Sequence, residues 1–169
     1  MTTTKIDPSD EFVYHVHQFV IRAALDLLPA KMSSPQARAM LLAIGLQESR
    51  FKHRQQIKGP AHGFWQFEKG GAVKGVLTHA STRPLLLPIL ELLRYKSDAQ
   101  TCYDAIVDND TLACIFARLL LWTVPGKLPV HTQEASAWSY YIEGWRPGKP
   151  HQQRWHDCFQ HAWKIVATE

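Results

Sequence analysis

The chain has 169 residues, of which 46% are hydrophobic and 20% charged, and its net charge is +4. This apolar content excludes an intrinsically disordered chain, and nine Gly and ten Pro are too few for a collagen-like or low-complexity one. We expect residues 1–169 to form a single domain that buries roughly two thirds of its unfolded surface. The basic excess favours polyanionic partners without choosing among nucleic acid, membrane surfaces and cell-wall polymers.

The sequence predicts neither a membrane span nor a secretory signal. No apolar run approaches the roughly 18 residues that cross a bilayer. The polar start from Met1 to Asp10 lacks the apolar region of a signal peptide. We therefore expect synthesis in the cytoplasm, with delivery to the periplasm or cell wall by a phage particle or a membrane-permeabilising partner.

Two helices are predicted in the N-terminal part. Apolar side chains recur every three or four residues from about Ser9 to Leu28, and Pro29 ends this helix. The second helix is predicted to begin at Ser33-Ser34-Pro35, because Ser can cap the first turn and Gln36 completes a capping box with Ser33. We expect this helix to run to about Phe51.

The middle of the chain changes from a Gly-rich segment back to helices. Residues Lys58 to Gly75 include five Gly and no sustained period, which predicts a loop with a short strand at Phe64 to Phe67. Helices are then expected from about Pro84 to Tyr95, and from a cap at Ser97, with Gln100 completing its capping box, to about Val107.

The C-terminal part contains the most apolar helix. Asp108-Asn109-Asp110 breaks and caps the chain before Leu112 to Trp122, which is apolar almost all round and therefore predicts a central buried helix. Thr132 can cap a helix to about Tyr141, and Gly144 to Pro150 should form a loop. The last helix has one clear apolar stripe, made of Trp155, Cys158, Phe159, Ala162, Trp163 and Val166. The fold class expected from these elements is all-α, with one long irregular insert.

The cysteines favour buried thiols over a disulfide framework. Their number is odd, and no Cys-x-x-Cys pair occurs. Cys114 lies in an apolar helical segment, and the spacing of Cys102, Cys114 and Cys158 shows no pairing pattern. His156, Cys158 and His161 are potential metal ligands, but the first does not share a helix face with the other two and no second ligand cluster exists. We predict no metal and no cofactor.

Glu48 interrupts an apolar helix face. The residues that share this face with it are Ala37, Met40, Leu41, Ile44 and Phe51. Desolvation and the negative end of the helix dipole both raise the pKa of a carboxyl group in this place. An acid still protonated near neutral pH is what glycosidic-bond cleavage needs. Alternatively, Glu48 reaches solvent or pairs with a nearby cation, namely Arg50, Lys52 or Arg54.

The residues that follow extend this pattern. Gln47-Glu48-Ser49-Arg50-Phe51 is followed by Gly63-Phe64-Trp65-Gln66, and Gln66 lies 18 positions after Glu48. This resembles the lytic transglycosylases of the lysozyme-like superfamily, which carry a helix-borne Glu-Ser pair and then Gly-Leu-Met-Gln. Tyr141-Ile142-Glu143-Gly144 is similar to the Ala-Tyr-Asn-Ala-Gly of that family, with Ile142 at the Asn position. The resemblance covers Ala37 to Phe67, and Leu112 to Gly144 more loosely, while the segment after Gly144 looks like small tailed-phage proteins of this kind.

The resemblance implies a lysozyme-like domain that cleaves the glycan strands of peptidoglycan. Glu48 would protonate the oxygen between N-acetylmuramic acid and N-acetylglucosamine, and would then deprotonate the C6 hydroxyl that attacks C1 to give a 1,6-anhydro product. Ser49 would orient the site, Gln66 would hydrogen-bond an N-acetyl group, and Gly63 occupies the family's Gly position. Four aromatic side chains would offer faces to sugar rings or else pack in the core: Phe64, Trp65, Tyr140 and Tyr141.

Other functions stay open. Glu68 or Glu143 could be the second acid of a lysozyme-type hydrolase, although Glu is more often exposed. A virion structural or glycan-binding protein could keep the fold with little activity, since Ile142 and the Phe64-Trp65 pair depart from the family, and its partners would include other virion proteins. A nucleic-acid binder is disfavoured, because the chain has no concentrated Lys/Arg recognition helix and no zinc or RNA-binding motif.

Overall fold

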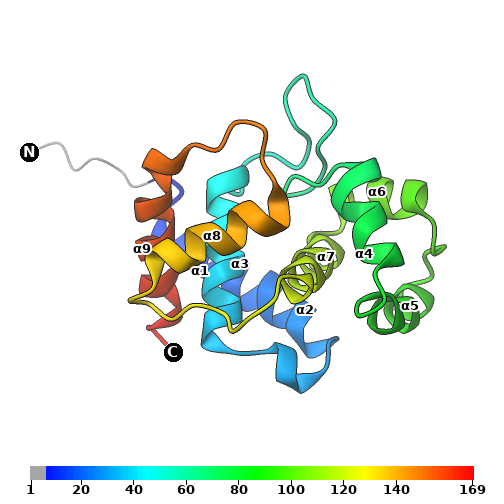
Figure 1. The fold of residues 1–169 in the computed structure, drawn as a ribbon, viewed down its shortest axis with the longest axis horizontal. Coiled ribbons are helices and arrows are strands. Elements are labelled where there is room, and N and C mark those ends of the chain that lie inside the picture. The colour runs from blue at the N-terminus through cyan, green and yellow to red at the C-terminus, as the bar shows by residue number, and fades with distance from the viewer. Residues whose placement is uncertain (1–6) are drawn as a thin grey trace, which may run out of the picture.

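The computed structural model describes residues 7–169, and this part of the chain is all-α (Figure 1). None of its helices combines the length and the apolar character that a membrane crossing requires. The helical elements, in chain order, are α1 Asp10–Val16, η1 His17–Ile21, α2 Arg22–Asp26, η2 Ala30–Met32, α3 Pro35–Glu48, η3 Lys69–Val73, α4 Lys74–Thr78, α5 Arg83–Leu92, α6 Ala99–Asp108, α7 Asp110–Thr123, α8 Glu134–Trp145, η4 Gln152–Arg154 and α9 Trp155–Val166.

Helix α7 lies between two groups of helices. In Figure 1 it is seen nearly end-on, with α1, α3, α8 and α9 on one side and α4, α5 and α6 on the other. It contacts α2, α3 and α8 as well as α4 and α6. Every residue from 112 to 121 is buried, which confirms the predicted central helix. Because α7 contacts helices of both groups, it holds the two groups in place relative to each other.

Helix α3 is buried as completely as α7, which its sequence pattern did not predict. Residues 39–47 are all buried, and α3 packs against the amphipathic α9 more extensively than any other pair of elements does. Its N-cap is Ser34, not the expected Ser33, because the Ser34 side chain accepts from the Ala37 N–H at 3.0 Å. A helix enclosed on all sides carries its C-terminal residue into the middle of the molecule.

Helix α3 ends at Glu48, three residues before the predicted end at Phe51. Arg50 and Phe51 adopt left-handed φ angles of 53° and 54°, which a continuing helix excludes. The turn brings the Phe51 ring back over the helix, where a Cβ on Gly45 would lie only 2.2 Å from the ring. The glycine therefore makes room for the reversal that leaves Glu48 at the end of the helix.

The segment after this reversal differs most from expectation. The predicted strand at Phe64 to Phe67 is wrong, since within the described chain this region holds only the isolated bridges Gln55↔His62 and His62↔Phe67. The predicted loop also ends early, because helix begins at Lys69. Val73, Val76 and Leu77 have helical spacing and are all buried, and their burial outweighs the unfavourable helix propensity of the glycines around them.

The remaining helices agree with the predictions within a few residues. Asp98 caps α6 in place of Ser97, and Asn109 caps α7 as expected. Helix α8 continues to Trp145 and stops where Arg146 turns left-handed, so the predicted loop at Gly144 begins too early. All three cysteines are free, with Cys102 and Cys114 buried and Cys158 partly buried.

Candidate active site

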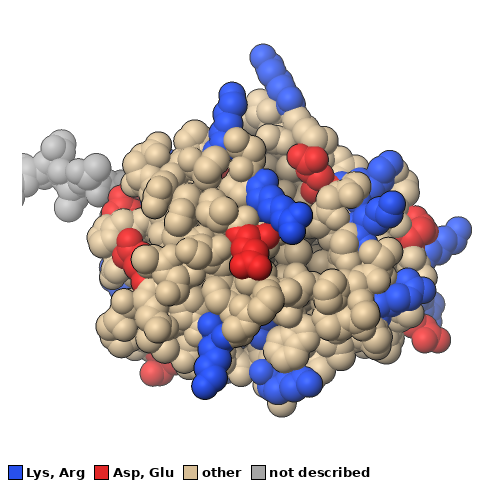
Figure 2. All heavy atoms as spheres, viewed as in Figure 1, with Lys and Arg blue, Asp and Glu red and all other residues tan. Residues whose placement is uncertain are grey.

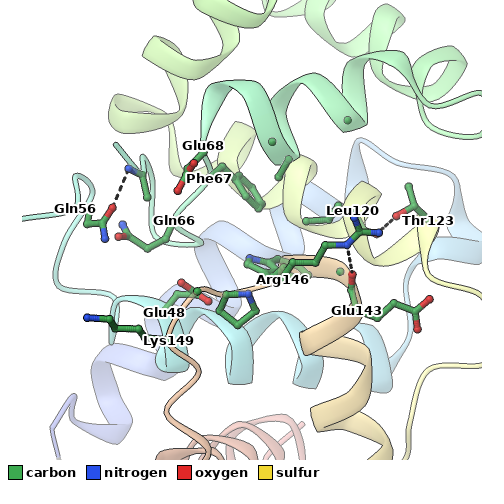
Figure 3. A pocket seen from close by; sticks show the side chains of 18 of the residues that line it. Glu48, Gln56, Gln66, Phe67, Glu68, Leu120, Thr123, Glu143, Arg146 and Lys149 are labelled. Atoms are coloured by element: carbon green, nitrogen blue, oxygen red, sulfur yellow. Dashed lines mark hydrogen bonds between the residues drawn. The ribbon is translucent and has the colours of Figure 1, made fainter. Parts of the chain in front are cut away.

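Glu48 lies in a cleft of about 870 Å³ between the two groups of helices. Its walls come from residues 56–75, from the end of α7 at Leu120 and Thr123, and from residues 143–151. Figure 3 shows Glu48 and Glu68 on facing sides of the cleft, with Gln66 between them. Helix α3 contributes Glu48 alone to this lining, so the carboxyl group is presented at the end of a buried element.

The surroundings of Glu48 favour its protonated form. Burial raises the pKa of Glu48 to about 7, against the lowering effects of a hydrogen bond from Tyr141 and of the charge on Arg154. The Tyr141 hydroxyl donates to Glu48 Oε1 at 2.5 Å. Among residues 7–169, no cation forms a salt bridge with Glu48, since Lys52 pairs with Asp7 and Arg54 with Asp110. The alternative of a surface ion pair is therefore wrong.

Ser49 links the end of α3 to the turn at residues 63–66. It is buried, and its hydroxyl donates to the Phe64 carbonyl oxygen at 2.6 Å while accepting from the Phe51 N–H at 3.1 Å. These bonds tie the end of α3 to the turn at residues 63–66. Ser49 does not line the cleft, so its expected role in orienting the site fits this position, and direct contact with a substrate does not.

Phe64 and Trp65 do not offer faces to a ligand, which corrects the prediction that they bind sugar rings. Phe64 is 1% exposed and Trp65 is 0% exposed. Both pack edge-on against Phe51, and the Trp65 indole N–H donates to the Leu41 carbonyl at 2.9 Å. The reversal at Phe51 turns both rings into the core.

Gly63, with φ of 75°, passes so close to α6 that a Cβ would lie 3.1 Å from the Ile106 carbonyl oxygen.

Gln66 reaches the cleft, as predicted for a substrate contact. Its backbone is left-handed with φ of 54°, which points its side chain away from the two buried rings before it. The side-chain amide Nε2–H of Gln66 donates to the Gly63 carbonyl oxygen at 2.9 Å, and this bond fixes the side chain in the cleft wall. A side chain held in this way can offer its carbonyl oxygen to an amide N–H of a ligand.

The two neighbouring tyrosines lie in different places. Tyr141 is buried, stacks on Trp155 at 5.3 Å between ring centroids, and reaches Glu48 with its hydroxyl. Tyr140 points the other way and donates to the Pro125 carbonyl at 3.0 Å, in the lining of a second cavity. Tyr140 therefore does not line the cleft of Glu48, where the prediction that it contacts the same ligand would place it, because successive residues of a helix face about 100° apart.

Two acids that the sequence analysis weighed as second catalytic acids also line the cleft. Glu68 and Glu143 are both exposed, as expected. Arg146 and Lys149, which the sequence analysis did not single out, bring positive charge to the wall formed by residues 143–151. Trp145 anchors that wall, since its indole N–H donates to the Trp65 carbonyl at 2.9 Å. The signal for Trp145, Arg146 and Lys149 was the Trp-Arg-Pro-Gly-Lys-Pro segment, which was interpreted as a loop and as a likeness to small tailed-phage proteins, but not as part of a site.

The potential metal ligands near the C-terminus are directed to separate partners. His156 contacts Glu134 at 3.0 Å, and His161 contacts Asp10 at 2.8 Å. In the described residues, no group of three His, Cys, Asp or Glu side chains is placed to hold a metal ion.

A raised carboxyl pKa predicts a stability that depends on pH. The unfolded Glu48 carboxyl titrates near 4.5 and the folded one near 7, so the folded chain binds a proton that the unfolded chain has released between these values. We expect the free energy of unfolding to fall as the pH rises through this window, by up to about 3 kcal/mol, and to level off above it. Urea denaturation at several pH values measures this fall, and Glu48→Gln should abolish it.

Tyr141→Phe is the matched variant for that measurement. It removes the hydrogen bond that stabilises the Glu48 carboxylate, so the pKa of Glu48 should rise further and the fall in stability should extend to higher pH. Identical pH dependence in the wild type and in Glu48→Gln would contradict a raised pKa for Glu48.

Comparisons of the chain with protein-family models, curated proteins and solved structures gave no match. The resemblance to lytic transglycosylases therefore depends on the motif residues from Glu48 to Gln66 and on Tyr141. Their geometry provides a buried acid, a hydroxyl bonded to it and a fixed amide, in one open polar cleft.

Proposed function

We propose that this chain is a lytic transglycosylase that cleaves the β-1,4 bond between N-acetylmuramic acid and N-acetylglucosamine in peptidoglycan, with Glu48 as its acid and base. The observation that carries the proposal is the Glu48 carboxyl group, partly buried in a cleft and with a pKa of about 7. At and just below neutral pH a substantial fraction of such a group is protonated and can donate a proton, and the carboxylate that donation leaves is basic enough to accept one.

The reaction needs only one carboxyl group. Glu48 gives its proton to the bridging oxygen as the bond between that oxygen and C1 of the muramic acid breaks. The resulting carboxylate takes the proton of the C6 hydroxyl, whose oxygen bonds to C1 and closes the 1,6-anhydro ring. Glu48 is then protonated again, and no water is consumed. Because the nucleophile belongs to the same sugar, its effective concentration is high.

The neighbours of Glu48 suit these steps. The Tyr141 hydroxyl donates to Oε1, which leaves Oε2 to carry the transferred proton. Gln66 lies on the wall between Glu48 and Glu68, where an N-acetyl group of a bound strand would meet it (Figure 3). A catalytic Glu at the end of a buried helix, between two groups of helices, also supports the lysozyme-like fold that the motif implies.

A lysozyme-type hydrolase is the second candidate function. It is favoured by one observation, namely that Glu68 and Glu143 line the same cleft as Glu48. A hydrolase uses a second carboxylate about 5–9.5 Å from the acid, either as the nucleophile or to activate water. Both side chains are exposed, unlike Glu48, and an exposed carboxylate lacks the fixed position that such a role needs.

The reaction products distinguish the two functions. Digestion of purified peptidoglycan should release fragments that end in 1,6-anhydro-N-acetylmuramic acid. Such ends resist borohydride reduction and are lighter by one water than hydrolytic ends, so mass spectrometry before and after reduction identifies them. Reducible ends would instead establish a hydrolase. The absence of fragments of either kind would favour the virion structural or glycan-binding role.

A further inference from the structure

A second cavity, of about 810 Å³, lies on the other side of the end of α7. Its walls are residues 121–130, with contributions from α8 and from residues 31–36. Most of the surface is apolar, from Trp122, Leu128 and Val130 among others, and three cations join it: Lys31, Arg118 and Lys127. Among the described residues, no Asp or Glu lines this cavity.

Arg118 is the unusual member of this lining. It is only 3% exposed, in an α7 whose neighbouring residues are all apolar. Its Nε–H donates to the Met32 carbonyl at 2.8 Å, but Nη1 is buried and has no hydrogen-bond partner in residues 7–169. Burial lowers the pKa of Arg118 to about 10, because the charged guanidinium group is desolvated and no carboxylate beside it offsets that cost. Buried guanidinium groups are normally paired, so this one lacks an expected anion.

Lys31 extends the positive charge around Trp122. The Lys31 ammonium group and the Arg118 guanidinium group each lie 5.4 Å from the Trp122 ring centroid. Lys31 and Lys127 are exposed, and no salt bridge engages either within the described chain. The segment 124–130 crosses the lower part of Figure 1, and Figure 2 shows Lys or Arg side chains along the lower edge of that same face.

We propose that this cavity binds the terminal carboxylate of a short apolar peptide, with Arg118 facing the carboxylate, Lys31 and Lys127 at the rim, and Trp122 and Leu128 against the apolar side chains. A guanidinium group forms charge-assisted hydrogen bonds with a carboxylate, and in Arg118 the Nη1 donor lacks a partner while Nε–H is already bonded to Met32. The apolar walls disfavour a free inorganic anion, which has no apolar part to bury. The site is separate from Glu48, and the proposal does not depend on glycan cleavage.

The probe is N-acetyl-alanyl-alanine, in its L,L and D,D forms, titrated into the full chain. The binding readout is the indole N–H signal of Trp122 in a two-dimensional nitrogen–proton NMR spectrum, assigned with Trp122→Phe. We expect this signal to shift to saturation in the millimolar range, while that of Trp145, in the other cleft, stays fixed. The L,L form represents free peptides and the D,D form cell-wall peptides, so the tighter one identifies the source. The C-terminal amide of the same peptide should not shift the signal.

Two variants test the site, one at the buried Arg118 and one confined to exposed side chains. Arg118→Lys retains a charge but loses the planar fork, and it should weaken binding by about tenfold or more. Lys31→Gln with Lys127→Gln changes only exposed side chains and should weaken binding several-fold. Lys58→Gln, an exposed lysine far from the cavity in sequence, is the matched control and should bind as the wild type does.

Equal shifts with the amide and the carboxylate, no saturable shift with either, or wild-type affinity in the double Lys variant would each overturn the proposal. Glu48→Gln should bind the probe normally. Loss of cell-wall cleavage with retained peptide binding would therefore count against neither proposal.

Discussion

Glu48→Gln is expected to reduce the rate of peptidoglycan cleavage by about two orders of magnitude or more. Gln has nearly the same shape and can still accept the Tyr141 hydroxyl, but it has no proton to donate to the glycosidic oxygen. The rate is measured as the fall in turbidity of suspended cell walls just below neutral pH, where Glu48 is largely protonated. Circular dichroism verifies that the variant is folded.

The matched controls are Glu68→Gln and Glu143→Gln, which remove the two exposed acids of the same cleft. Under the single-acid mechanism, both should keep activity within a few-fold of the wild type. A Glu48→Gln variant that clears cell walls at the wild-type rate would remove Glu48 from the mechanism. A loss in Glu68→Gln as large as that in Glu48→Gln would favour the hydrolase.

Trp65→Ala is expected to destabilise the fold by about 3–5 kcal/mol. The indole is fully buried, it packs against Phe51 and Phe64, and its N–H is bonded to Leu41 of α3. Trp65→Phe keeps much of the packing and removes the indole hydrogen bond to the Leu41 carbonyl, which should cost a smaller amount, about 0.5–1.5 kcal/mol. Urea denaturation followed by circular dichroism measures both changes.

Phe19→Ala serves as the control for that series, because Phe19 is 66% exposed and its removal should change the free energy of unfolding by less than about 0.5 kcal/mol. The result also tests where Trp65 acts. A Trp65→Ala variant with unchanged stability but lost cell-wall binding would mean that the ring does meet the glycan.

Most helices could be predicted because their signals are local. Asn109 caps α7 through a bond to an N–H three residues away, and the spacing of Trp155, Phe159 and Ala162 alone defines the buried face of α9. The end of α3 could not be predicted in this way. It depends on the Phe51 ring packing over Gly45, a contact that a periodic pattern does not encode.

Glu48 could be singled out as a candidate because a carboxyl group on an apolar helix face is an exception that the sequence displays. Its bond with Tyr141 joins residues 93 positions apart, and only the fold brings them together. The wrong expectations share one cause. The motif predicted which residues lie near Glu48, among them Phe64, Trp65 and Tyr140. The direction of their side chains depends instead on the left-handed turns after α3 and on which face of α8 is turned toward the cleft.

The reversal after α3 also leads into nine consecutive exposed residues, 52–60, which form the projecting loop in Figure 1, and Gln56 of this loop lines the cleft. Exposed loop tips of this kind tolerate cleavage and insertion better than packed segments do. A protease cut there would divide the chain into a piece with Glu48 and a piece with Tyr141, while the contacts of Trp65 with Leu41 and Phe51 hold the two pieces together. The same position would accept a grafted wall-binding module, at the mouth of the cleft and outside the core.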